Sequence, residues 1–325
     1  MPVEGRVAGE RDEGSETRRR RVRLLCIAVY VFAFVATTLL WGFPASRDRV
    51  LIWVIAALVI AAAGRPSGLS RLVVDFLPVI VFLYLYDLLR VGADQLSSHV
   101  YVLPQLRVDE WLFGGTAPTV TLQRALWTSG HPHVWDYLAI AVYLTYFVVP
   151  ITVAAVLWYR AHERFGRYVC LWIGLSFAAL ITYALYPASP PWLASRGGAL
   201  PHVVRIAPKL THSLGVDLSR VMDSQKYVNK VAAVPSLHAA TALLIAMFFW
   251  SWTVRWRWVL VLYPVAMAVS LVYLGEHYVS DVLLGWIYAV VIFVAGNRLY
   301  DRWSARRAVR DAAQAGPGPQ PQGLA

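Results

Sequence analysis

Three polar side chains stand together at the start of an apolar segment near the C-terminal end of the chain. In the stretch EHYVSDVLLGW, residues 276–286, His277 and Asp281 are four positions apart. If this segment is helical, their side chains lie one turn apart on the same face. A histidine oriented by a carboxylate can act as a nucleophile, although the same pair can also be a plain polar contact.

A second histidine lies in a segment that is typical of a helix start. In AAVPSLHAATALL, residues 232–244, Pro235 suits the first helical turn because its missing N–H costs nothing there. The free N–H groups of that turn and the helix dipole form an anion site. Ser236 and His238 would lie beside this site as donors. A serine cap and an interfacial histidine without chemistry would give the same pattern.

The two histidines would meet if the intervening chain forms a helical hairpin. His277 follows His238 by 39 residues, which is enough for one apolar crossing and a return. Such a pair suits phosphoryl transfer without a metal: His277, held by Asp281, attacks phosphorus, and His238 protonates the leaving alkoxide. The sequence has no metal-ligand spacing, so we expect neither a metal nor a cofactor.

The elements that must position these residues have the composition of a membrane protein. Of 325 residues, 58% are hydrophobic and 15% are charged, whereas soluble domains carry about 25% charged residues. The net charge of +11 would suit nucleic acid, but the arginines bracket apolar runs, which favours a membrane and no nucleic-acid partner. Runs that can cross a bilayer lie at 24–43, 50–64, 72–90, 134–158, 168–187, 234–250, 258–275 and 279–298.

We therefore predict an all-α, polytopic membrane bundle of about eight transmembrane helices. The basic residues concentrate in the short loops and tails of one face, which the positive-inside rule assigns to the cytoplasm. Both termini would then be cytoplasmic, and every histidine except His162 would lie at or beyond the outer face of the cell membrane. We expect disordered cytoplasmic tails over 1–22 and 304–325, and one membrane domain over 23–303.

The two histidine segments resemble the signatures of the type 2 phosphatidic acid phosphatase superfamily. Its Pro-Ser-x-His is matched at residues 235–238, and its His-x-x-x-Asp is matched at residues 277–281. The resemblance implies a six-helix phosphatase-like core, here preceded by two N-terminal helices. It also implies that His277 is the nucleophile, Asp281 its orienting group, His238 the general acid and Ser236 a phosphate ligand.

Further segments look like one branch of that superfamily, the inositol phosphorylceramide synthase or inositolphosphotransferase-like branch. They are DEWLFGG at 109–115, LQRALW at 122–127, YPASPPWLASR at 186–196, NKVAAVPSLHAA at 229–240 and LGEHYVSDVLLG at 274–285. With these segments the resemblance extends over most of the chain. It implies a lipid substrate and an acceptor that is a polyol or another lipid.

Two phosphate-binding positions of the wider superfamily are filled differently here. Leu58 stands where a lysine usually precedes the Arg-Pro signature, and Leu271 stands where an arginine usually precedes the reactive histidine. Cations elsewhere on the outer face must then hold the phosphate. The candidates are Arg90, Arg196 and Lys230. Pairing of Arg90 with Asp87 and snorkelling of the lysine are the structural alternatives.

These features predict an enzyme that cleaves a lipid phosphoester at the outer membrane face through a phosphohistidine. The acceptor is water, as in a phosphatase, or an alcohol, as in a phosphotransferase, and the catalytic residues do not separate the two. The competing function is a transporter or flippase in which Asp75, Asp87 and Asp281 relay protons with the histidines. A non-catalytic lipid-binding scaffold is the third alternative.

Overall fold

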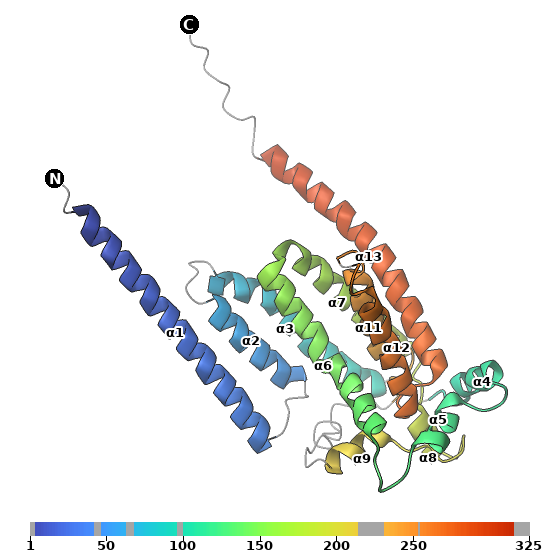
Figure 1. The fold of residues 1–325 in the computed structure, drawn as a ribbon. Coiled ribbons are helices and arrows are strands. Elements are labelled where there is room, and N and C mark those ends of the chain that lie inside the picture. The colour runs from blue at the N-terminus through green and yellow to red at the C-terminus, as the bar shows by residue number, and fades with distance from the viewer. Residues whose placement is uncertain are drawn as a thin grey trace.

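Long helices arranged side by side make up most of the protein (Figure 1). The computed structural model describes residues 4–41, 47–62, 68–95, 100–213, 231–252 and 254–314. Within these ranges the regular structure is helical, and the only β-type pairing is a set of isolated bridges of Ala188 with Tyr101 and Ala232. The all-α class predicted from the sequence is confirmed.

Every predicted span coincides with a helix. These helices are α1 (Glu4–Trp41), α2 (Arg47–Ala62), α3 (Gly68–Gln95), α6 (Val134–Arg160), α7 (His162–Leu185), α11 (Leu237–Phe249), α12 (Arg257–Tyr273) and α13 (Val279–Gln314). Within the described residues, α3, α6, α7 and α13 contain stretches long and apolar enough to cross a membrane, and the other four contain shorter apolar stretches. The chain is a polytopic helical membrane protein.

Two helices extend past the domain boundaries expected from the sequence. Helix α1 begins at Glu4, within the expected N-terminal tail, and α13 continues to Gln314, within the expected C-terminal tail. The N-terminal extension is rich in Arg and Glu, and the C-terminal extension is rich in Arg and Ala. These residues favour the helical state even without an apolar face. The boundaries of the membrane domain at 23 and 303 stay a prediction.

Helix α11 occupies the centre of the C-terminal half. It packs against α12, α13, α7 and α6, while α3 packs on the far side of α7. Buried apolar side chains fill the space between them, with Leu175 and Leu244 among those fully enclosed. Because lipid is as apolar as these side chains, close packing and internal hydrogen bonds hold such helices together. One such bond joins the Tyr168 hydroxyl to the Pro150 carbonyl at 3.1 Å.

Four short helices gather at one end of the bundle (Figure 1). They are α4 (Leu103–Leu112), α5 (Pro118–Leu126), α8 (Pro191–Arg196) and α9 (Ile206–Ser213). They belong to the two long loops that the sequence places on the outer face. Helices α11 and α13 begin at this same end, so the loops lie next to the segments that carry His238 and His277.

Candidate functional site

The two histidines of the motif segments lie side by side. The His238 and His277 ring centroids are 5.7 Å apart, with an angle of 57° between the ring planes. His238 lies in the first turn of α11, and His277 lies two residues before α13 begins. His277 is only 6% exposed. The structure therefore brings together two imidazoles that are 39 residues apart in the chain.

The carboxylate of Asp281 lies behind His277. The distance from Asp281 Oδ2 to His277 Nδ1 is 3.5 Å, longer than a typical hydrogen bond. The same oxygen accepts the Tyr278 backbone N–H at 2.9 Å, which fixes the carboxylate where it can orient the imidazole. Catalytic hydrogen bonds are often long without substrate. With Nδ1 facing the carboxylate, the other ring nitrogen, Nε2, is the atom available for attack.

Main-chain atoms join the two motif segments directly. The Ser236 N–H donates to the Asp281 carbonyl at 3.0 Å. Gly285, one turn further along α13, lies against the Ser236 backbone so closely that a Cβ would overlap its carbonyl oxygen. The Ser236 hydroxyl caps α11 by accepting the Ala239 N–H at 3.4 Å. The start of α11, with its N–H groups, is thereby held against the helix that carries Asp281.

Three aromatic side chains of α6 pack around His238. The Tyr143 ring stacks on the imidazole at 5.1 Å, and the Tyr146 ring lies at 3.9 Å. Phe147 packs edge-on at 5.9 Å. These rings restrict the rotamers open to His238 and keep its imidazole facing His277.

A largely enclosed ion pair adjoins His277, and the sequence analysis did not predict its cation. Arg205 donates from Nε and Nη2 to the two carboxylate oxygens of Glu276, at 2.8 and 3.2 Å. The two side chains are 15% and 9% exposed. The Arg205 guanidinium also lies over the Trp192 ring at 4.8 Å. The position of Glu276 beside His277 was the one sequence signal that a cation would be needed here.

The phosphate-binding cations predicted from the sequence are only partly described. Arg196 is exposed, and its guanidinium lies over the Trp192 ring at 4.9 Å, as that of Arg205 does. Arg90 belongs to α3, but its side chain lies outside the described part of the structure. Lys230 lies outside the described residues altogether. Among the predicted phosphate ligands whose side chains the structure describes, Ser236 precedes His238 by two residues and contacts Asp281 through its backbone N–H.

Asp109 connects α4 to the start of α13. Its carboxylate accepts the Val279 and Ser280 N–H groups, each at 2.9 Å, so a residue distant in sequence caps this helix. Burial raises the pKa of Asp109, and the two backbone N–H groups oppose that effect by stabilising the ionised form. Burial and the nearby carboxylates of Asp281 and Asp109 also raise the pKa of Tyr278, which keeps its phenol protonated.

Gln123 of α5 holds the turn that leads into the site. Its amide nitrogen donates to the carbonyls of Val204 and Tyr273, both at 2.8 Å, and its oxygen accepts the Val204 N–H at 2.8 Å. Gly275 follows in this turn with φ +80°, and a Cβ there would meet the Val204 carbonyl oxygen at 2.9 Å. The loop that carries Arg205 is therefore fixed against the residues just before His277.

A second carboxylate–histidine contact lies at the opposite end of the bundle. Asp75 of α3 accepts the Trp158 indole N–H at 2.8 Å and lies 3.6 Å from His162 Nε2. These groups join α3 to the junction of α6 and α7, far along the helices from His277. Among the described residues, no cluster of three His, Cys, Asp or Glu side chains could hold a metal ion.

Comparison with known proteins agrees with this arrangement of motifs. The profile of the PAP2 superfamily matches residues 106–295, which include both histidine segments. The chain belongs to the PAP2 superfamily.

Its relatives within the superfamily lie in the inositol phosphorylceramide synthase branch. Phosphoinositol dihydroceramide synthase of Bacteroides thetaiotaomicron is 28% identical over 250 residues, which cover 74% of this chain and 80% of the relative. Inositol phosphorylceramide synthase catalytic subunit AUR1 of Saccharomyces cerevisiae is 25% identical over 252 residues, which cover 72% of this chain and 61% of the relative. The Schizosaccharomyces pombe catalytic subunit aur1 is 30% identical over 128 residues, covering 38% and 30% of the two chains. No solved structure matches the chain significantly.

Proposed function

We propose that this protein is a lipid phosphotransferase that moves a phosphoinositol-type headgroup between membrane lipids through a phosphohistidine on His277. The observation that carries the proposal is the pairing of His238 and His277 at 5.7 Å, with Asp281 behind the second. The names of the relatives support the headgroup and suggest a ceramide-type lipid as acceptor.

In the first half of the reaction, His277 Nε2 attacks the phosphorus of a phosphoinositol lipid. The bond between phosphorus and the diacylglycerol oxygen breaks, and His238 gives that oxygen its proton. Asp281 stabilises the positive charge that develops on the His277 ring. The product is phosphoinositol bound through its phosphorus to His277.

In the second half, the hydroxyl of the acceptor lipid replaces the histidine. His238, now neutral, removes the hydroxyl proton, and the acceptor oxygen attacks phosphorus as the bond to His277 breaks. Ser236 and the N–H groups at the start of α11 hold the equatorial oxygens during both steps. Arg196, Arg90 and Lys230 are the proposed additional cations.

The outer membrane face is the proposed side of the reaction. The basic residues predict that both termini are cytoplasmic, which puts the starts of α11 and α13 outside. The His162–Asp75 contact would then be cytoplasmic. A proton-relaying transporter is less well supported, because Asp75 and Asp281 lie at opposite ends of the bundle and each has its own local partners.

A transfer assay tests the proposal. The purified protein in lipid nanodiscs with EDTA is given phosphatidylinositol and a fluorescent ceramide, and inositol phosphorylceramide is measured. We expect His277→Ala and His238→Ala each to lose about a thousandfold in turnover, since each removes an essential acid–base or nucleophilic group. The exposed outer histidine His131 provides the matched control, and His131→Ala should keep wild-type turnover.

The outcomes separate the parts of the proposal. Acid-labile phosphate on wild-type protein but not on His277→Ala would support the covalent intermediate. Wild-type turnover in both histidine variants would refute the mechanism. Release of inorganic phosphate from lipid phosphates, without transfer from phosphatidylinositol, would refute the headgroup and identify a phosphatase.

A further inference from the structure

The aromatic residues that pack around His238 form a single cluster on α6. Tyr146 and Phe147 follow Tyr143 by three and four positions, so the three side chains share one face of the helix. The Phe147 ring contacts the rings of Tyr143 and Tyr146, with centroids 5.9 and 5.2 Å apart. All three rings also contact the His238 imidazole. These residues, the α6 aromatic cluster, therefore cover one side of His238 with apolar surface.

The helix that carries the cluster borders the lipid. It contains a stretch long and apolar enough to cross a membrane, and Leu138 in its outer part is 61% exposed. The surroundings of His277 are of the opposite kind, because Glu276 precedes it and forms an ion pair with Arg205. His238 thus has apolar neighbours from a membrane helix, whereas His277 has a charged pair beside it.

The stereochemistry of the proposed reaction puts the acceptor hydroxyl next to His238. In an in-line transfer the leaving oxygen lies on the far side of phosphorus from the attacking nitrogen of His277. The acceptor oxygen attacks from that same side, because it displaces the bond between phosphorus and His277. His238 exchanges a proton with both oxygens, so each must come within hydrogen-bond reach of its imidazole. Residues that pack on His238 therefore border the position of the acceptor oxygen.

We propose that the α6 aromatic cluster excludes water from this position, so that the hydroxyl of a membrane lipid is the acceptor. The inference rests on the proposed function, because it concerns the second half of that reaction. A lipid alcohol can lay its apolar body against α6, whereas aromatic rings offer water no comparable contact.

Exclusion of water protects the covalent intermediate from hydrolysis. If water reaches the acceptor position, its oxygen bonds to phosphorus, the bond from phosphorus to His277 Nε2 breaks, and His238 takes the proton. The product is then free inositol phosphate, and the headgroup is lost to the lipid acceptor.

The ratio of hydrolysis to transfer tests the proposal. The full-length protein in nanodiscs receives phosphatidylinositol labelled in its inositol ring and a ceramide. Water-soluble inositol phosphate and inositol phosphorylceramide are measured in the same sample. We expect Phe147→Ala to raise the ratio of the first product to the second about tenfold, equivalent to about 1.4 kcal/mol, because the space left between the two tyrosine rings admits water. Unfolded protein lowers both products together, so an unchanged ratio would overturn the proposal.

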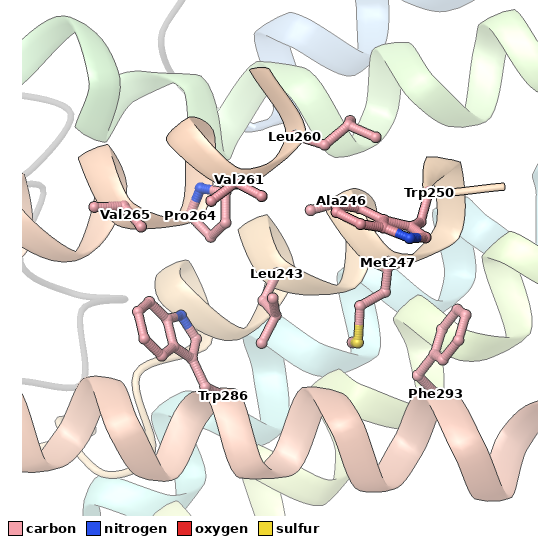
Figure 2. Close-up of a pocket in the computed structure, with 10 residues that line it drawn as sticks. All are labelled: Leu243, Ala246, Met247, Trp250, Leu260, Val261, Pro264, Val265, Trp286 and Phe293. Carbon is pink, nitrogen blue, oxygen red and sulfur yellow. The ribbon is translucent and has the colours of Figure 1, made fainter. Parts of the chain in front are cut away.

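Phe293→Ala is the matched control. Phe293 and Phe147 are both half-buried, but Phe293 lines an apolar groove on a different side of α11 (Figure 2). Residues of α11, α12, α13 and the turn after α11 line this groove, whereas His238 packs against α6. The same loss of a ring there should leave the ratio unchanged. An equal rise in both variants would reflect a general loosening of the bundle and would refute the role of the cluster.

The lifetime of the His277 adduct gives a second measurement. With phosphatidylinositol and no ceramide, rapid quenching follows the release of inositol phosphate from the labelled protein. Release should be about tenfold faster in Phe147→Ala than in the wild type or Phe293→Ala. If Phe147→Ala yields no folded protein, Phe147→Leu removes the ring with less loss of volume and carries the same expectation. Wild-type protein that forms neither product would refute the proposed function, whereas transfer with equal ratios in all variants refutes only the role of the cluster.

Discussion

One oxygen of the Asp281 carboxylate contacts two groups of the preceding segment. Its Oδ2 accepts the Tyr278 N–H and faces His277 Nδ1. The carboxylate is fully buried, so its charge acts on the imidazole with little screening by water. At the scale of single residues, this arrangement is consistent with the proposed role of Asp281, which is to orient His277 and stabilise its charge.

We expect Asp281→Asn to lower turnover about a hundredfold or more while the protein still folds, since the amide fills the same space without the charge. Rapid-quench measurement of phosphohistidine formation checks this directly. Asp301→Asn, near the other end of α13, makes the same charge change and should keep normal rates. A twofold or smaller effect of Asp281→Asn would show that the orienting role is wrong.

Gly285 sets the distance between the two motif segments. We expect Gly285→Ala to destabilise the protein by about 1–3 kcal/mol, because the added methyl group overlaps the Ser236 carbonyl and forces α11 and α13 apart. Thermal unfolding in detergent measures the effect, and turnover should fall with it.

The matched control for this substitution is Gly174→Ala. Gly174 is also helical, but a Cβ there meets only Ile292, at 3.9 Å. Because alanine favours helix more than glycine does, the control should be as stable as the wild type or more so. Equal behaviour of the two variants would contradict the close approach at Gly285.

Some of the site could be predicted from the sequence because its geometry is local. The four-residue spacing brings Asp281 to His277, although His277 lies just before α13 and not in its first turn. Pro-Ser-x-His marks the start of α11, but Pro235 lies before the serine N-cap, whereas the sequence predicted it in the first helical turn. The ion pair of Arg205 with Glu276 could not be predicted in this way. The two residues are 71 positions apart, and a loop crossing the end of the bundle brings them together. No periodic pattern encodes such a contact.

At the scale of elements, α4 and α13 are coupled through one side chain. We expect Asp109→Ala to cost about 1–2 kcal/mol of stability, because the Val279 and Ser280 N–H groups lose their cap. Hydrogen exchange at the first turn of α13 should speed up, and turnover should fall because this turn adjoins His277. Glu110→Ala removes the same charge from the next position and should leave the exchange unchanged. Unaltered exchange in Asp109→Ala would show that the cap does not stabilise this turn.

The long helices and the short ones differ in how far the sequence predicts them. Apolar runs are a local property, so all eight predicted spans coincide with helices. The sequence predicts only two long loops where helices α4, α5, α8 and α9 lie. Their positions depend on contacts such as those of Asp109 and Gln123, which the folded protein makes between distant segments.

At the scale of the whole molecule, orientation decides where the reaction takes place. We expect a reporter fused after Ala325 to read cytoplasmic, because the basic loops favour that side for both termini. Green fluorescent protein at this position should fluoresce, and alkaline phosphatase should be inactive. The reverse result would move the site to the cytoplasmic face and overturn the proposed topology.

The hydrogen bond from the Ser236 N–H to the Asp281 carbonyl uses atoms that every amino acid other than proline possesses. A side-chain substitution at either position leaves its donor and acceptor in place, so the spacing of the reaction centre is largely independent of which groups line it. Under the proposed function, headgroup and acceptor preference can therefore change through the surrounding loops while the geometry at the two histidines is kept. Protein engineering can therefore vary the residues around Arg196 and Trp192. The backbone contact between Ser236 and Asp281 should be kept.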